Sequence, residues 1–299
     1  MNASIASVKN APVVIFVYNR PESAQNLLQN IRNLKSYTNR NYYIFSDGGK
    51  DVDDWRKVLS VRSTIKSFPD LKAEVFESEC NLGLANSVIS GVTRVLEKHD
   101  SAIVLEDDLA LSDDFFLFMD SGLAGFRNHK EVLAVCGYAW RFAFSKEPLY
   151  TSDRFCSWGW AIWEDRWSSI DWDISNVNLK KLRREVNKAG GDIYGMIDAQ
   201  KRNKIDSWAV RLVLFQIRKG LVSVHPKISR SINLGLNNSG THSKFSLRYK
   251  SELSINSSEH FRFPSTLKPR VINQIGLRLL HSRLLRLIDY LYNVSKRTF

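Results

Sequence analysis

The stretch Ile103–Phe116, IVLEDDLALSDDFF, contains two acidic clusters separated by a short apolar run. The first cluster, Glu106-Asp107-Asp108, directly follows apolar residues with the length and composition of a buried strand. Carboxylates crowded together repel one another, so each cluster needs compensation, either by a cation or by the positive end of a helix. Which compensation applies to which cluster decides where a ligand site can lie.

The second cluster has the features of a helix start. Ser112 precedes Asp113 and Asp114, and apolar residues at helical spacing follow from Phe115. A serine side chain accepts a hydrogen bond from the first turn of a helix, and aspartates stabilise its positive end. We therefore expect Ser112 to be an N-cap and this cluster to be structural.

The first cluster has no helix start beside it. Acidic groups at the end of a buried strand are best stabilised by a divalent cation, for which carboxylate oxygens are hard ligands. Position alone leaves two roles open for these three residues, a metal site and a structural one.

Outward from this stretch, the first half of the chain alternates strand and helix patterns. Helical spacing of apolar residues follows three of the five predicted strands, and Pro21 suits the first turn of the first helix. Such alternation predicts an α/β fold with a mainly parallel central sheet flanked by helices, whose ligands bind at the carboxyl ends of the strands. The predicted strands are 13–17, 42–46, 73–77, 102–105 and 132–136, and the helices are 24–34, 58–65 and 84–96.

The second half differs in character. A tryptophan-rich stretch, Trp158–Trp172, is followed by predicted helices near 179–188 and 207–219 and by a strand at 221–226. A loop rich in Asn, Gly and Ser follows, and the segment 279–297 is amphipathic and basic.

Composition excludes several classes of protein. Of 299 residues, 43% are hydrophobic and 25% charged, as in ordinary globular proteins. No window approaches the roughly 18 uninterrupted apolar residues of a membrane span, and no secretory signal pattern is present. Three scattered cysteines, Cys80, Cys136 and Cys156, argue against a disulfide framework and a CxxC metal site. The sequence therefore predicts a reducing cytoplasm.

The net charge of +12 is unevenly placed. Residues 262–299 contain eight Lys or Arg side chains against one acid, Asp289. A basic, amphipathic tail on a more balanced domain predicts a docking element for an anionic membrane surface. The alternative, that the helix packs across the domain or on a partner protein, stays open.

Two further strand ends have polar residues that suit a ligand. Arg20 lies just before a helix N-terminus, which suits a diphosphate. Asp47, in Ser46-Asp47-Gly48-Gly49, supplies a carboxylate where a ligand could approach the backbone. From this motif alone, a plain turn residue is the better interpretation of Asp47.

The order of these motifs resembles that of a GT-A glycosyltransferase, most closely the N-acetylglucosaminyltransferase I type with its EDD motif, and bacterial family-2-like sugar transferases. The resemblance covers roughly residues 11–246. It is carried by Asn19-Arg20-Pro21, Ser46-Asp47-Gly48-Gly49, Asn81-Leu82-Gly83-Leu84, Glu106-Asp107-Asp108, Trp158-Gly159-Trp160, Asp206-Ser207-Trp208, His225–Arg230 and Gly240-Thr241-His242. Lys227 and Ser207 depart from the family pattern, which has acidic residues there, and no membrane anchor precedes the domain.

This resemblance implies a metal-dependent inverting transfer of a sugar from a nucleotide-sugar, expected to be UDP-linked, to a glycan or lipid-linked glycan in surface polysaccharide synthesis. It implies a nucleotide-binding half at 11–140 and an acceptor half with a lid loop at 141–246, which leaves a tail at 1–10 and a basic extension at 247–299 outside it. The basic extension leads us to expect a cytoplasmic protein at the inner face of the cell membrane. The implied roles are Asp108 for Mn²⁺ or Mg²⁺, Asp107 for the ribose, Glu106 for the donor sugar, Arg20 for the phosphates, Asp47 for the uracil, Asn81 and His242 for the donor, the 237–244 loop for closure over it, and Asp206 for the general base.

Five residues have competing interpretations. The structural alternative for Asp206 is a helix N-cap. Most tryptophans in such clusters belong to the core, but sugar sites favour aromatic platforms. We expect Trp158 and Trp160 to line the acceptor cleft and Trp163 and Trp167 to be buried.

Two other classes of protein are alternatives to a glycosyltransferase. A sugar nucleotidyltransferase would also need carboxylates and a cation, but it usually carries a glycine-rich phosphate loop, and residues 18–21 contain no glycine. A nucleic-acid-binding protein would interleave aromatic and basic residues on one face. Here the aromatics lie far from the basic tail in the sequence, so nucleic acid is not an expected partner.

Overall fold

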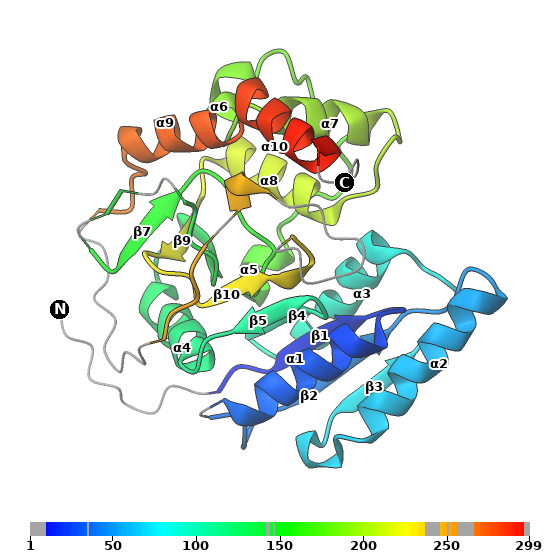
Figure 1. Cartoon of the computed structure of the whole chain (residues 1–299). Helices are drawn as coiled ribbons and strands as arrows, with labels where there is room; N and C mark the ends of the chain where they lie inside the picture. The colour runs from blue at the N-terminus through cyan, green and yellow to red at the C-terminus, as the bar shows by residue number, and fades with distance from the viewer. Residues whose placement is uncertain are drawn as a thin grey trace.

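The computed structural model describes residues 10–34, 36–141, 144–145, 147–236, 246–249, 251–255 and 266–295. Its centre is an eight-stranded sheet with the order β3-β2-β1-β4-β8-β6-β9-β7. The expected α/β fold, with a mixed central sheet flanked by helices and a helical C-terminal extension, is confirmed (Figure 1). The strands of this sheet are β1 (Val13–Val17), β2 (Tyr42–Ser46), β3 (Glu74–Glu77), β4 (Ser101–Glu106), β6 (Val132–Cys136), β7 (Leu149–Ser152), β8 (Trp160–Trp163) and β9 (Val222–Pro226).

The strands β3, β2, β1 and β4 are all parallel, and they form the half of the sheet that matches the sequence analysis best. Strand order runs outward from β1 through β2 to β3, and the chain then returns to place β4 on the other side of β1. The carboxyl ends of β1 and β4 therefore flank a topological switch point, where open α/β sheets leave a crevice for ligands.

Helices cover both faces of the sheet. On one face, α1 (Pro21–Asn33) and α2 (Val52–Lys66) bury apolar side chains against β1 and β2, and α4 (Phe115–Phe126) packs on β6 and β8. On the other face lie α3 (Leu84–Leu96), α6 (Arg183–Lys188), α7 (Ile193–Lys201) and α8 (Trp208–Lys219). Pro21 occupies the first turn of α1 as expected.

The second half of the sheet is where the strand prediction falls short. The tryptophan-rich stretch contains β8, which runs antiparallel between β4 and β6 and so joins the two halves into one sheet. A short ribbon, β5 (Leu109–Leu111) and β10 (Ser231–Asn233), was also not predicted. Residue patterns near these strands lack period-two alternation because β8 is buried on both faces and the ribbon strands have three residues each.

The predicted N-cap at Ser112 is wrong by two residues. The helix α4 begins at Phe115, and its N-cap is Asp114. Ser112 donates its backbone N–H to the carbonyl of Arg230, so it continues the pairing of the β5–β10 ribbon instead of starting the helix. The Ser112 hydroxyl lies 2.7 Å from Asp114 Oδ1.

The described part of the C-terminal extension contains the α-helices α9 (Val271–Leu280) and α10 (Arg283–Ser295). The inner side of α9 packs on the domain and buries Leu277 and Leu280. Asn273 Oδ1 accepts the backbone N–H of Phe144 at 2.7 Å, and Arg278 Nε donates to the carbonyl of Asn187 at 3.0 Å. The alternative that the tail packs across the domain is therefore right for this side of α9.

None of the described helices combines the length and the apolar character that crossing a membrane requires.

Candidate active site

The switch point brings together residues that the sequence analysis singled out. Arg20 follows β1, and its guanidinium forms ion pairs with Asp107 and Asp108, which follow β4. Arg20 Nη1 lies 3.0 Å from Asp108 Oδ2, and its side chain is 47% exposed. A half-exposed guanidinium beside two carboxylates can still reach a ligand in the crevice.

Contacts between the residues just after β1 and the first turn of α2 hold the segment that carries Arg20. The hydroxyl of Tyr18 and the amide of Asn19 both donate to the carboxylate of Asp54 on α2. Asp54 also accepts the backbone N–H of Lys50 at 3.3 Å. These contacts fix the direction in which the chain leaves β1, and the sequence analysis did not find them because Asp54 lies in an ordinary acidic first turn.

The carboxyl groups at the end of β4 have strongly perturbed acidities. Burial, together with the charges of Asp108 and Asp107, raises the pKa of Glu106 to about 8, although Arg20 opposes this shift. Burial also raises the pKa of Asp107 to about 7, although Arg20 opposes this shift. Burial lowers the pKa of Arg20, but the charges of Asp107 and Asp108 outweigh burial and raise this pKa above its ordinary value. Such shifts at a strand end mark a candidate functional site.

The ribbon adds a residue that sequence reasoning missed. Pairing of β5 with β10 sets Asn233 opposite Leu109, one residue beyond Asp108. A Cβ atom added to Gly235 would lie 3.1 Å from Asn233 Oδ1 and 3.5 Å from Asp108 Oδ2, so the two side chains share one small space. The Asn-rich loop was visible in the sequence, but its pairing partner was not.

These oxygens suit a divalent cation. Asp108 Oδ1 and Asn233 Oδ1 are buried acceptors without a hydrogen-bond partner, which is costly unless a cation or another donor meets them. Among the described residues no group of three or more His, Cys, Asp or Glu side chains forms a closed metal site. An open site fits Mg²⁺ or Mn²⁺, since such ions commonly take one or two carboxylates and complete their shell with phosphate oxygens and water.

Asp47 and Asn81 form a second group, on the loops after β2 and β3. Asp47 Oδ1 accepts the backbone N–H of Leu82 at 2.8 Å, and Oδ2 accepts that of Gly83 at 3.0 Å. Asn81 Nδ2 donates to the carbonyl of Gly48 at 2.8 Å. The carboxylate of Asp47 therefore ties the two loops together, and its role toward the uracil stays a prediction.

We expect Asp47→Ala to lower the free energy of unfolding by about 1–3 kcal/mol, because it leaves partly buried backbone N–H groups without an acceptor. Urea denaturation measures this change. Asp53→Ala is the matched control, since that side chain is 81% exposed and its pair with Arg56 contributes little. A variant that keeps full stability and loses only donor affinity would show that Asp47 acts on the ligand alone.

Asp206 lies apart from these two groups, just before α8. Its carboxylate is 54% exposed and forms an ion pair with Arg211. The N-cap of α8 is Ser207, whose hydroxyl accepts the backbone N–H of Val210 at 3.3 Å. The alternative that Asp206 is the N-cap of α8 is therefore wrong, and its carboxylate takes no part in capping this helix.

Of the two tryptophans expected to line the acceptor cleft, the structure buries Trp160 in the core. Trp160 is fully buried in β8 and stacks on Trp208 at 5.2 Å between ring centroids, so it does not fit a role in an acceptor cleft. Trp158 is partly buried and lies 4.6 Å from the ring of Tyr138. Its acceptor role stays a prediction. Trp163 and Trp167 are buried, as expected.

His242 and the 237–244 loop lie outside the described residues. The structural role of the second acidic cluster agrees with the geometry, since Asp114 is buried and pairs with Arg230 Nε at 2.9 Å.

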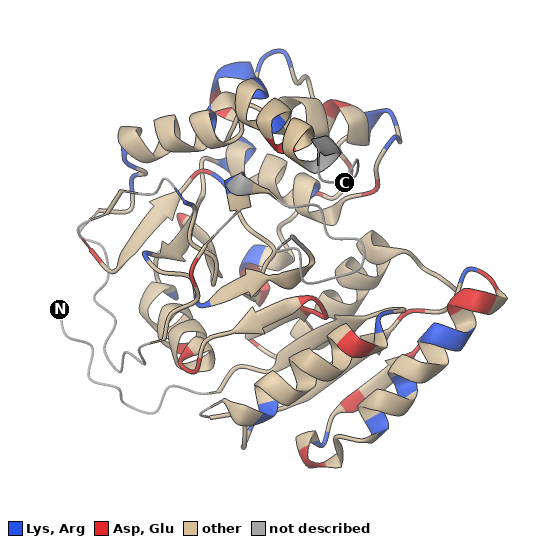
Figure 2. Cartoon of the chain, in the orientation of Figure 1, with Lys and Arg blue, Asp and Glu red and all other residues tan. Residues whose placement is uncertain are grey.

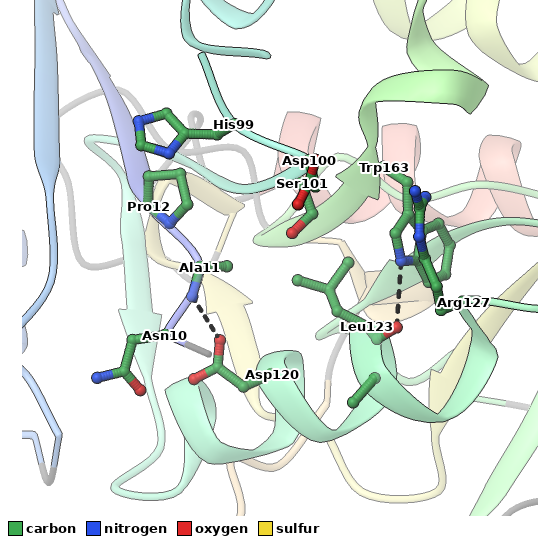
Figure 3. Close-up of a pocket in the computed structure, with 11 residues that line it drawn as sticks. Asn10, Ala11, Pro12, His99, Asp100, Ser101, Asp120, Leu123, Arg127 and Trp163 are labelled. Carbon is green, nitrogen blue, oxygen red and sulfur yellow. Dashed lines mark hydrogen bonds between the residues drawn. The ribbon is translucent and has the colours of Figure 1, made fainter. Parts of the chain in front are cut away.

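A cavity of about 190 Å³ lies at the opposite end of the sheet, where β1 and β4 begin (Figure 3). Its polar groups already have partners in the protein. Asp120 Oδ1 accepts the backbone N–H of Ala11 at 3.1 Å, and Trp163 Nε1 donates to the carbonyl of Leu123 at 3.1 Å. This cavity is therefore a poor candidate for the active site.

No protein-family model matches this chain, and no curated protein matches it significantly in sequence. Solved structures of glycosyltransferases do match. A mannosyltransferase from Pyrobaculum calidifontis, in complex with GDP-Man and Mn²⁺, is 16% identical with a TM-score of 0.39, over 51% of this chain and 44% of its own. TarS residues 1–349 from S. aureus are 11% identical with a TM-score of 0.37, over 59% of this chain and 54% of their own.

This chain thus spans about half the length of the solved structures that it matches. Likenesses this distant do not decide function, which has to be argued from the residues of the site.

Proposed function

We propose that this chain is a metal-dependent inverting glycosyltransferase that moves a sugar from a nucleotide-sugar, UDP-linked in our proposal, to a glycan or lipid-linked glycan. The observation that carries the proposal is the group formed by Arg20, Asp107, Asp108 and Asn233 at the switch point of the sheet. It combines a cation for phosphate with buried, unpartnered oxygens for a metal ion.

The residues of this group divide the work of holding the donor. Asp108 and Asn233 would hold the Mn²⁺ or Mg²⁺ ion, and Arg20 would bind the diphosphate directly. Once bound, the ion neutralises negative charge on the leaving diphosphate. Asp107 and Glu106, one residue apart on the same edge, would bind the ribose and the sugar, and Asp47 and Asn81 would hold the loops beside the base.

Transfer also needs a base for the acceptor. The acceptor hydroxyl oxygen forms a bond to the anomeric carbon while the bond from that carbon to the diphosphate oxygen breaks, and the electron pair leaves with the nucleoside diphosphate. In the proposal, Asp206 takes the hydroxyl proton. Two observations support that role: the carboxylate of Asp206 is exposed, and Ser207 caps α8 in its place. Trp158 is the proposed platform for the acceptor sugar.

The acceptor is proposed to be a glycan or lipid-linked precursor of a surface polysaccharide, met at the inner face of the cell membrane. Association with that surface through the C-terminal segment is part of the proposal.

A panel of nucleotide-sugars tests the proposed function. Purified protein with Mn²⁺ or Mg²⁺ should release a nucleoside diphosphate from one donor in the panel, and chelation with EDTA should stop the release. Release of pyrophosphate from a nucleoside triphosphate and a sugar phosphate would instead identify a nucleotidyltransferase. Absence of turnover with every donor, with and without glycan acceptors, would contradict the proposal.

A further inference from the structure

The C-terminal helices α9 and α10 expose an unusual amount of apolar surface. Of the eighteen large apolar side chains that are exposed in the described part of the chain, nine lie on these two helices. The nine residues, called the apolar face here, are Val271, Ile272, Ile275, Leu279, Leu284, Leu287, Ile288, Tyr290 and Leu291. On each helix these residues recur at helical spacing, so they gather on one side of it, and exposed apolar surface gathered in this way marks an interaction site.

The apolar face is not the side by which the helices pack on the domain. On α9, Leu277 and Leu280 are 4% and 1% exposed, whereas Val271 and Leu279 are 69% and 59% exposed. On α10, Asp289 is buried and forms an ion pair with Arg248, which turns Leu284 and Leu291 toward solvent. Each helix therefore packs on the domain with one side and has a second, apolar side that no described residue covers.

Basic side chains border the apolar face. Lys268, Arg270, Arg278 and Arg283 are exposed beside it, and Asp289 is the one acid within residues 266–292. A second basic segment adjoins α9, because Arg278 donates to the carbonyl of Asn187 on α6. Figure 2 shows Lys and Arg in and beside α6, and the exposed members are Lys180, Lys181, Arg183 and Arg184.

This combination identifies the occupant by its chemistry. A second copy of the chain, related by a twofold axis, would bring these basic borders against each other, and like charges in contact oppose association. A surface that binds a protein partner would be expected to contain more aromatic residues than Tyr290, the single aromatic member of the apolar face. An anionic bilayer offers both an apolar layer for the leucines and isoleucines and negative headgroups for the basic border.

We infer that the apolar face of α9 and α10, together with the basic segment at 180–184, docks the protein on an anionic lipid bilayer. The apolar side chains insert at the headgroup level, and the lysines and arginines contact the lipid headgroups. This goes beyond a purely electrostatic tail, because insertion resists salt whereas attraction between exposed charges is screened by it. The inference deepens the membrane association of the C-terminal segment and rests on that part of the proposed function, but not on the transferase chemistry.

Cosedimentation of the full chain with vesicles tests the inference. Wild-type protein should bind phosphatidylcholine–phosphatidylglycerol vesicles, and the double variant Ile275→Ser/Leu279→Ser should bind at least about tenfold more weakly. The matched control is Val52→Ser/Leu59→Ser on α2, whose side chains are 70% and 58% exposed, and it should bind like wild type. Lys181→Glu/Arg184→Glu should also weaken binding, by about 25-fold or more, since each basic residue contributes about fivefold near an anionic surface.

Circular dichroism of every variant checks that the fold is intact. The inference is overturned if wild type does not bind these vesicles, if Ile275→Ser/Leu279→Ser binds as wild type does, or if the α2 control loses binding equally. It is also overturned if the α9 variant instead abolishes a dimer seen by analytical ultracentrifugation. Donor turnover measured without lipid is a separate readout, so its failure would contradict the proposed function and leave the docking result standing.

Discussion

Asp108→Asn is expected to abolish sugar transfer while leaving the protein folded. The substitution keeps the shape of the side chain but removes the charge that would hold the metal ion beside Asn233. An ion at such a site contributes several kcal/mol to stabilising the transition state, so we expect the rate of nucleoside diphosphate release to fall about a thousandfold. Electron paramagnetic resonance of Mn²⁺ provides a second readout that does not depend on turnover.

The control for this prediction lies in the same stretch of sequence. Asp113→Asn changes an exposed aspartate of the second acidic cluster and should leave both turnover and Mn²⁺ binding unchanged. The stability of Asp108→Asn should also change little, because its partner Arg20 is half-exposed and retains Asp107. Undiminished turnover and Mn²⁺ binding in Asp108→Asn would refute the metal assignment.

Leu280→Ala is expected to destabilise the whole protein, although Leu280 lies in the C-terminal extension. Its side chain is 1% exposed where α9 packs on the domain. Removing a buried leucine costs the transfer free energy of the lost methyl groups and leaves a cavity, together about 2–5 kcal/mol. Urea denaturation followed by tryptophan fluorescence measures this loss.

The adjacent residue provides the comparison. Leu279 is 59% exposed, so Leu279→Ala should change the free energy of unfolding by no more than about 0.5 kcal/mol. Equal stability of Leu280→Ala and wild type would show that α9 is only loosely attached to the domain. Because Leu279 and Leu280 differ in this way, substitutions on the outer side of α9 test membrane docking better than deletion of the segment. Deletion would also remove the side of α9 that packs on the domain.

The strands that the sequence predicted well are those whose burial is complete and local. The runs at 13–17, 42–46 and 132–136 have the bounds of β1, β2 and β6. Parallel strands buried on both faces are continuously apolar, so their ends are visible where polar residues begin. For the same reason Arg20 and the acidic cluster could be placed at one edge of the sheet before any contact was known.

Other features depended on contacts between distant parts of the chain. Asn233 comes beside Asp108 only through the β5–β10 ribbon, and Ser112 loses its predicted capping position to the same ribbon. Trp160 could not be assigned from its neighbours in sequence, because its burial comes from stacking on Trp208.

By itself, the sequence determined the parallel half of the sheet and the edge at which Arg20 meets the acidic cluster, because both follow from local burial and the direction of the strands. Tertiary structure alone decided which oxygens lie beside Asp108, which tryptophans are buried and which side of α9 faces solvent. Those outcomes depend on pairing and packing between segments far apart in the chain, and an amphipathic pattern such as that of α9 does not say which of its sides the domain will cover.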